Sequence, residues 1–260
     1  MFARFTQAIV CPPARNFADG LTTVNDGAPD VDRALAQHAA YCDALSRHGC
    51  ALVPLRADVR YPDSTFVEDA ALILPGVAAL LARPGAASRT GETDAIYDAL
   101  SPYFPGMAHI EAPGTLDAGD VCEAEHHVYI GLSHRTNEMG ARQLTDWLAA
   151  HRVRGVTVDI RQTPGILHLK SGVTALGERR LLAIDALASH PAFADYEVLS
   201  VPAGEEYAAN CVRVNEVVFV ADGYPRTHAL LRERGYRLEI LPMSEFAKMD
   251  GGLSCLSLRF

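Results

Sequence analysis

Four hairpin-like segments recur along the chain, and they constrain its fold more than any other feature of the sequence. In each segment two short apolar runs flank a brief turn; the segments span 70–81, 121–132, 173–184 and 212–221. Short turns of this kind between apolar runs are typical of β-hairpins. The segments lie roughly 40 to 50 residues apart, a spacing typical of repeated supersecondary units. The sequence therefore predicts a protein built from repeated modules.

A fifth strand and a set of helices complete the predicted modules. The fifth apolar run, CLSLRF, begins at Cys255, and the N-terminal segment RFTQAIV (4–10) is a candidate partner for it. Apolar residues at helical spacing predict helices between the hairpins, at 30–48, 92–100, 136–151 and 227–234. Thr136 is the expected N-cap of the third helix. A shorter helix over 185–194 is interrupted by Pro191.

The modules predict an α/β protein of five hairpin-plus-helix units. A ring closed by the N-terminal strand would leave no exposed sheet edge, which is a physical reason for closure. The residues alone leave one alternative open, an ordinary α/β sheet that contains hairpins. No linker or shift in composition divides the chain, so residues 1–260 are expected to form a single catalytic domain.

Charge and composition exclude several classes of protein. The chain has 23 Lys and Arg against 32 Asp and Glu, a formal net charge of −9, which disfavours a nucleic-acid partner and suits a small cationic one. No apolar run reaches the roughly 18 residues of a membrane helix. Six cysteines without CxxC spacing favour free thiols in the cytoplasm. Phosphate-loop, dinucleotide, zincin and serine-hydrolase motifs are absent, and we expect no metal or cofactor.

A polar cluster comes directly before the first apolar strand of each predicted module. The clusters span 62–69, 114–120, 167–172, 207–210 and 250–255. If the modules surround one axis, the clusters meet at one place. Together they hold carboxylates, an imidazole, an amide and a thiol, namely Asp63, Glu68, Asp69, Asp117, Asp120, His168, Asn210 and Cys255. The carboxylates, the imidazole and the thiol can form a nucleophilic site with acid–base support.

Each of these residues also has a purely structural interpretation when it is taken alone. A cysteine such as Cys255 often packs as a small apolar side chain, and His168 between two leucines could be a hydrogen-bonded core residue. Aspartates beside glycine frequently form turns, and adjacent acids can simply be solvated. The pair His126-His127 has no spaced partner and falls in a predicted turn, so we expect it to be solvated rather than to bind a metal.

Short motifs that occur in one order along nearly the whole chain resolve these alternatives. They are ADGLT (18–22), YPDSTFVEDA (61–70), ARPGAASRTGE (82–92), IEAPGTLDAGD (110–120), YIGLSHRTNEMGA (129–141), LHLKSG (167–172), YAANC (207–211), GYPRT (223–227) and KMDGGLSCLSLRF (248–260). Together they resemble the dimethylarginine dimethylaminohydrolase family of the pentein, or guanidine-modifying, superfamily. The resemblance implies a five-bladed α/β propeller with its active site on the axis.

The resemblance also implies roles for individual residues. Cys255 would be the nucleophile, His168 the general acid and base, and Asp117 the group that orients the histidine. Related sequences carry Glu or Asp at the position of Asp117. The remaining residues would bind substrate: Asp63, Glu68 and Asp69 the guanidinium, Phe66 by packing on it, Arg89 and Arg135 the α-carboxylate, Leu21 from a mobile loop over the site, and Met249 through its main chain.

The expected reaction is hydrolysis of asymmetric dimethylarginine or monomethylarginine to citrulline and dimethylamine or methylamine. It would pass through a covalent thiouronium on Cys255. The nearest alternative is an arginine deiminase that releases ammonia, although such enzymes usually carry an extra helical insertion. A non-catalytic arginine-binding protein on the same scaffold and a cysteine amidase of another fold are further alternatives. The resemblance suggests a homodimer.

Overall fold

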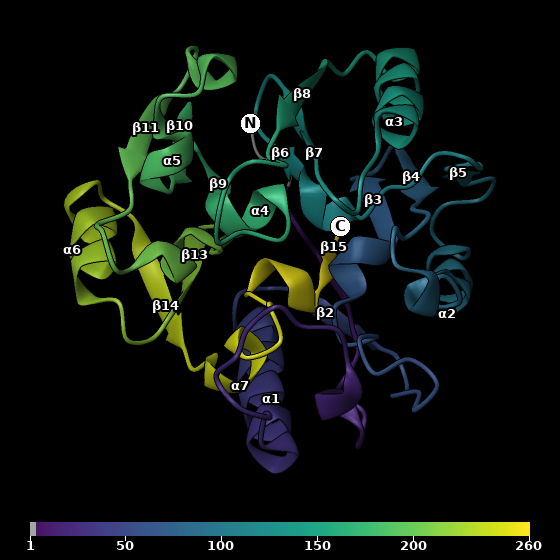
Figure 1. The fold of residues 1–260 in the computed structure, drawn as a ribbon, viewed down its shortest axis with the longest axis horizontal. Helices are drawn as coiled ribbons and strands as arrows, with labels where there is room; N and C mark the ends of the chain where they lie inside the picture. The colour runs from purple at the N-terminus through teal and green to yellow at the C-terminus, as the bar shows by residue number, and fades with distance from the viewer. Residues whose placement is uncertain (1–3) are drawn as a thin grey trace.

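The computed structural model describes residues 4–260 as five sheets of three strands each. In every sheet the middle strand pairs antiparallel with one neighbour and parallel with the other. The sheet orders are β15-β1-β2, β3-β4-β5, β6-β7-β8, β9-β10-β11 and β12-β13-β14. Figure 1 shows the sheets arranged around a common centre in chain order.

The strands are short, and their bounds are as follows: β1 (Gln7–Val10), β2 (Ala51–Pro54), β3 (Ala71–Leu74), β4 (Ala78–Leu81), β5 (Ala108–His109), β6 (Val121–Glu123), β7 (Val128–Leu132), β8 (Gly155–Asp159), β9 (Val173–Gly177), β10 (Arg180–Ala183), β11 (Glu197–Ser200), β12 (Val212–Val214), β13 (Val217–Ala221), β14 (Arg237–Leu241) and β15 (Leu258–Arg259). All four predicted hairpins are confirmed. The fifth strand does pair with the N-terminal strand, through Ala8 with Arg259 and Ile9 with Leu258.

One helix in each unit connects the middle strand to its parallel partner, as a parallel pair requires. These helices are α1 (Val31–Arg47), α2 (Glu92–Leu100), α3 (Glu138–Ala150), α5 (Asp185–Ala188) and α6 (Pro225–Glu233). In Figure 1, α1, α2, α3 and α6 lie at the periphery, away from the common centre of the sheets. Two further helices, α4 (Leu169–Gly172) and α7 (Ser244–Ala247), are a single turn each. No helix among the described residues is long and apolar enough to cross a membrane.

The sequence-based prediction missed the last strand of every unit. These strands are short, and β5 has only two residues, so period-two alternation has little room to appear. The predicted fifth strand is also shorter than expected, because Cys255 lies on a 3-10 turn (Ser254–Leu256) before β15 begins. The helix expected over 185–194 is two pieces, since α5 ends at Ala188 and a separate 3-10 turn begins at Pro191.

Two local predictions were wrong. The N-cap of α3 is Asn137, whose side chain accepts a hydrogen bond from Gly140 N, whereas Thr136 is buried and binds Asp120 instead. His127 is not solvated, because its ring is buried and stacks on Tyr129. An imidazole can pack this way because its body is largely apolar.

The apolar core fills the spaces between neighbouring sheets. Tyr129 of β7, Leu182 of β10 and Val220 of β13 belong to one buried cluster, which therefore spans three sheets. Ala8 of β1 and Phe219 of β13 share a second cluster across two sheets. Burial of apolar surface from both partners is what holds adjacent sheets together. The inner ends of the sheets thus form a rigid frame for the polar segments at the centre.

Candidate active site

The five polar clusters do meet at the centre, each carried by a short helix that leads into the first strand of its sheet. The helices are 3-10 turns at Val67–Ala70, Ala118–Asp120, Glu206–Ala209 and Ser254–Leu256, together with α4. The turn at Val67–Ala70 contacts those at Ala118–Asp120 and Ser254–Leu256, and α4 contacts those at Ala118–Asp120 and Glu206–Ala209. The convergence expected from the repeated position of the clusters is therefore confirmed.

Asp120 ties two of these segments together. One carboxylate oxygen accepts the main-chain N–H of Leu169 at 3.0 Å, and the other accepts the hydroxyls of Ser133 at 2.6 Å and Thr136 at 2.7 Å. Burial raises the pKa of Asp120 to about 6. Because Leu169 directly follows His168, this carboxylate fixes the main chain that presents the histidine.

His168 and Asp117 form a buried imidazole–carboxylate pair. His168 Nε2 lies 3.0 Å from Asp117 Oδ2, while Asp117 Oδ1 accepts the N–H of Gly85 at 2.8 Å. Burial disfavours the imidazolium, but the surrounding carboxylates of Asp69, Asp120 and Asp117 outweigh it and raise the pKa of His168 to about 9. Burial would raise the pKa of Asp117, yet its hydrogen bond with His168 keeps that pKa below the ordinary value.

The other ring nitrogen of His168 faces a second carboxylate. His168 Nδ1 lies 3.8 Å from Asp69 Oδ1, beyond a direct hydrogen bond. That oxygen accepts the N–H of Gly119 at 3.1 Å. A Cβ atom at position 119 would collide with both the carboxylate and the ring, so only glycine permits this approach. With Nε2 held by Asp117, Nδ1 is the nitrogen available to exchange a proton with a reactant.

Cys255 lies at the centre with very little of its side chain, 7%, exposed. Its sulfur accepts from Gly252 N at 3.4 Å and lies 3.8 Å from Asn210 Nδ2. Burial, together with the negative charges of Glu68 and Asp69, raises the pKa of Cys255 to about 12. The thiol therefore stays protonated until a positive charge comes close to it.

Four of the expected substrate-binding residues lie together beside this centre. The carboxylate of Asp63 accepts the main-chain N–H of Leu21 at 3.0 and 3.2 Å, which ties the segment around Leu21 to the site. Gly20 lies against Asp63 and Met249, and the ring of Phe66 lies against Gly251. Phe66 and Met249 are buried, whereas the Leu21 side chain is 40% exposed and can meet a ligand or solvent.

The two arginines expected to hold a substrate carboxylate have different surroundings. Arg89 is 5% exposed, and its guanidinium binds Asp69 at 2.5 Å and Glu92 at 2.7 Å, with a further bond to the carbonyl of Phe66. This geometry supports a role for Arg89 in holding Asp69 in place. The sequence-based prediction was that Arg89 binds the α-carboxylate of the substrate. Arg135 is half-buried, and its guanidinium makes no hydrogen bond or ion pair within residues 4–260.

Arg135 nevertheless lies near the acidic wall of the site, formed by Asp63 and Asp69. Burial raises the pKa of Asp63, and the positive charges of Arg89 and Arg135 oppose that rise. The main chain of Arg135 packs directly against Gly85, whose N–H binds Asp117. Arg135 thus lies at the site with guanidinium donors that no described residue accepts. Arg89, in contrast, uses its guanidinium to hold Asp69.

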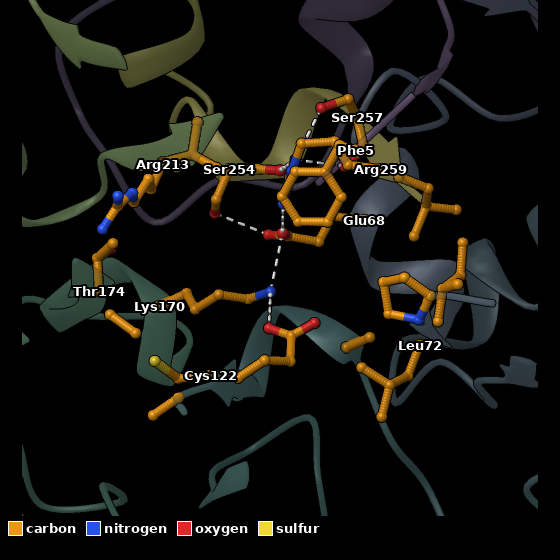
Figure 2. Close-up of a pocket in the computed structure, with 18 of the residues that line it drawn as sticks. Phe5, Glu68, Leu72, Cys122, Lys170, Thr174, Arg213, Ser254, Ser257 and Arg259 are labelled. Atoms are coloured by element: carbon orange, nitrogen blue, oxygen red, sulfur yellow. Dashed lines mark hydrogen bonds and ion pairs between the residues drawn. The ribbon is translucent and has the colours of Figure 1, made fainter. Parts of the chain in front are cut away.

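Glu68, expected to contact a guanidinium, is already held by side chains of the protein. Its Oε1 accepts from Lys170 Nζ at 2.8 Å and Arg259 Nη2 at 3.1 Å, and its Oε2 accepts from Ser254 Oγ at 2.7 Å. Figure 2 shows these side chains pointing toward one another in a cavity of about 220 Å³. Burial would raise the pKa of Glu68, but Lys170 and Arg259 outweigh it and lower that pKa.

Within the described part of the chain, one group of side chains has the spacing of a metal site. Ligand atoms of Asp69, Asp117 and His168 lie within 4.8 Å of one another. These atoms already have protein partners, since Arg89 and Gly119 bind Asp69 and His168 binds Asp117. The donor set fits an acid–base pair better than it fits a cation. The absence of a metal remains a prediction.

Several residues of the site were given no role from the sequence. Lys170 and Arg259 neutralise Glu68, Glu92 completes the pair with Arg89, and Asn210 touches the cysteine sulfur. Lys170 and Asn210 lie inside the polar clusters, so their position in the sequence could have indicated that they belong to the site. Glu92 and Arg259 lie outside them and carry no such signal.

A thiol, an imidazole–carboxylate pair and an acidic wall, brought together by five three-stranded sheets, define a pentein-like α/β protein with a cysteine-hydrolase type of centre. No protein-family model matches the chain. A dimethylarginine dimethylaminohydrolase of Pseudomonas aeruginosa is 44% identical over 257 residues, covering 98% of this chain and 100% of the relative. One of Streptomyces coelicolor is 35% identical over 255 residues, covering 97% and 96%. The chain belongs to the dimethylarginine dimethylaminohydrolase family.

Solved structures agree with this assignment. The Pseudomonas aeruginosa enzyme, as a cysteine-to-serine mutant complexed with citrulline, superposes with a TM-score of 0.95 at 43% identity, covering 99% of this chain and 100% of that one. The N-terminal domain of a cyanobacterial arginine dihydrolase superposes with a TM-score of 0.87 at 19% identity, covering 99% and 97%. At that identity the second likeness concerns the fold alone.

Proposed function

We propose that this protein hydrolyses N-ω-methylated arginines, asymmetric dimethylarginine and monomethylarginine, to citrulline and dimethylamine or methylamine. The observation that carries the proposal is the His168–Asp117 pair, whose free Nδ1 faces Asp69 at the centre that also holds Cys255. Membership of the dimethylarginine dimethylaminohydrolase family supports the same substrate class. The active site, in this proposal, belongs to a single catalytic domain over 1–260, of which residues 1–3 lie outside the described part.

Substrate charge is central to the first step. A guanidinium is a planar cation that carboxylates bind through paired hydrogen bonds. Placed against Asp69 and Asp63, with Phe66 packed on it, the cation would offset the negative charge that raises the pKa of Cys255. The substrate would thus favour the thiolate that attacks it, and positioning of the two reactants lowers the barrier further.

The reaction then proceeds through a covalent intermediate. When the substrate binds, the Cys255 thiol loses its proton to solvent. The thiolate forms a bond to the guanidinium carbon, and the bond from that carbon to the methylated nitrogen breaks. His168, through Nδ1, gives the leaving amine its proton, and a thiouronium remains on Cys255. Water, deprotonated by His168, adds to the same carbon; the carbon–sulfur bond breaks as the remaining hydroxyl proton passes to the sulfur, and citrulline leaves. Asp117 keeps the imidazole in the orientation that both proton transfers need.

Other residues recognise the rest of the substrate. Arg135 has the free donors to hold the α-carboxylate, and Leu21 covers the site from its loop, while the main chain of Met249 adds a contact. Arg89 holds Asp69 in place, and Glu68, paired with Lys170, holds Ser254 beside Cys255. We further propose a closed five-bladed propeller, a homodimer, and a cytoplasmic location, the last because all six cysteines are free.

A product assay tests the proposed function. Purified protein is given asymmetric dimethylarginine, monomethylarginine and arginine in separate reactions, and citrulline and the released amine are measured. We expect citrulline with dimethylamine or methylamine from the methylated substrates. Citrulline and ammonia from arginine at a higher kcat/KM would instead identify a deiminase. Binding of all three without product would identify a non-catalytic arginine-binding protein.

A further inference from the structure

A side-chain amide lies against the cysteine sulfur, and the reaction scheme above does not use it. Asn210 is 4% exposed and follows the 3-10 turn at Glu206–Ala209. Its Nδ2 lies 3.8 Å from Cys255 Sγ, and its Oδ1 accepts the main-chain N–H of Ser254 at 3.1 Å. A Cβ atom at Gly252 would collide with this amide, so the segment from 252 to 255 packs tightly around it.

We propose that Asn210 positions Cys255 and donates a hydrogen bond that stabilises its thiolate. The proposal rests on the proposed function in one respect, namely that Cys255 is the nucleophile. The amide bridges two units of the fold, since it belongs to the segment before β12 and grips the segment before β15. One side chain thereby fixes the nucleophile relative to the rest of the centre.

The orientation of the amide is set by its partners. If Oδ1 and Nδ2 were exchanged, the N–H of Ser254 would face an NH₂ group and the sulfur would face an oxygen. The exchange would leave the buried N–H of Ser254 without an acceptor, which is costly. The Ser254 N–H therefore selects the orientation that directs Nδ2 toward Cys255.

A neutral donor suits this place for an electrostatic reason. Glu68 and Asp69 oppose ionisation of the thiol, so donors to the sulfur are needed. Gly252 N–H supplies one, and Asn210 supplies the second. A lysine or arginine here would pair with the acidic wall and repel a guanidinium substrate. An amide stabilises the thiolate while leaving the negative charge of the wall for the substrate.

Tyr207 provides a matched control. It belongs to the same short segment as Asn210, and its hydroxyl donates to the carbonyl of Gly251 at 2.7 Å. Tyr207 thus holds the same loop in place, through a carbonyl rather than through the sulfur. Loss of this bond tests the loop's position without removing a donor to Cys255.

The experiment measures the rate at which iodoacetamide alkylates Cys255 between pH 7 and 10, with the modified peptide identified by mass spectrometry. Removing a hydrogen bond to a charged group should slow Cys255 alkylation in Asn210→Ala by roughly tenfold at a fixed pH and move its profile to higher pH. Asn210→Asp, which keeps the acceptor for Ser254 but removes the donor, should slow it further. Tyr207→Phe should stay within about twofold of the unmodified protein.

The outcomes separate the inference from the proposed function. Equal profiles for Asn210→Asp and the unmodified protein would overturn the role of Asn210, as would a Tyr207→Phe profile shifted as far as that of Asn210→Ala. If Asn210→Ala does not fold, as judged by its melting transition, the near-isosteric Asn210→Asp decides alone. If Cys255→Ser still turned over methylarginine, Cys255 would not be the nucleophile. That result would overturn the proposed function, whatever the alkylation profiles show.

Discussion

Two buried clusters of charge lie at the centre of the molecule, and they differ in how far their charges are balanced. Around Glu68, two carboxylates meet two cations: Lys170 and Arg259 both bind Glu68, and Lys170 also pairs with Glu123 at 3.5 Å. Around His168, the carboxylates of Asp69, Asp117 and Asp120 face one imidazole and one guanidinium, that of Arg89, which Glu92 also binds. The first cluster is complete within the protein, whereas the second carries negative charge that the protein does not neutralise.

The difference separates a structural cluster from a reactive one. Buried charges are tolerated when they are paired and hydrogen-bonded, and a paired cluster mainly fixes the geometry of its neighbours. An unbalanced cluster costs folding free energy, and it persists where function uses the stored negative potential. In the proposed function, the Glu68 cluster therefore fixes the structure beside Cys255, and the His168 cluster meets the cationic substrate.

The largest expected effect comes from neutralising the carboxylate that orients the imidazole. Asp117→Asn should lower kcat by roughly 10²–10⁴-fold with a smaller change in KM, because proton transfer by His168 depends on that orientation. Steady-state kinetics with dimethylarginine would measure it. A kcat close to that of the unmodified protein would show that the carboxylate of Asp117 serves the fold only.

The next effect distinguishes the two arginines. Arg135→Ala should cost about 2–4 kcal/mol in kcat/KM for dimethylarginine and little for its decarboxylated analogue, because the lost partner is the substrate carboxylate. Arg89→Ala is the matched variant, and it should impair both substrates because Asp69 loses its support. If Arg135→Ala impairs both substrates equally, the assignment of Arg135 to the carboxylate is wrong.

Arg89 and Glu68 show most clearly how much of the site can be predicted from the sequence. The hairpins follow from apolar runs that flank short turns, and the meeting of the polar clusters follows from their repeated position before each first strand. No local sequence pattern predicts the partners of these two residues. Arg89 binds Glu92, and Glu68 binds Lys170 and Arg259. Motif resemblance identified both as site residues, yet only the packed structure shows that protein groups already occupy their hydrogen-bonding atoms.

The two clusters should also respond differently to pH. The pKa of His168 is raised from 6.5 to about 9, so the stability that its proton adds is fully present below pH 6.5 and is lost as the pH rises through 9. Lys170 has a pKa raised above its ordinary value and Glu68 a lowered one, so neither changes charge in this window. The Glu68 cluster should therefore contribute a constant stability.

Denaturant unfolding at several pH values checks this contrast. The difference in unfolding free energy between the unmodified protein and His168→Gln should shrink by on the order of 2 kcal/mol between pH 6 and 9.5. The same difference for Lys170→Met should stay constant. A pH-independent difference for His168→Gln would contradict the view that the aspartates hold an imidazolium.

The smallest effect concerns the exposed side chain above the site. Leu21→Gly should raise KM a few-fold and leave kcat within about twofold, because the main-chain bond to Asp63 remains while the cover over the substrate is lost. Val77→Gly, at an exposed position in the β3–β4 turn, is the control and should change neither constant. An unchanged KM for Leu21→Gly would remove Leu21 from substrate binding.

The most direct test of the account is to find where the substrate carbon becomes attached. Protein mixed with carbon-labelled dimethylarginine is quenched in acid during turnover, digested, and mapped by mass spectrometry. The account predicts a labelled adduct on the peptide that contains Cys255, and neither adduct nor citrulline from Cys255→Ser. A label on Cys122 or Cys211, or citrulline formed by Cys255→Ser, would contradict it.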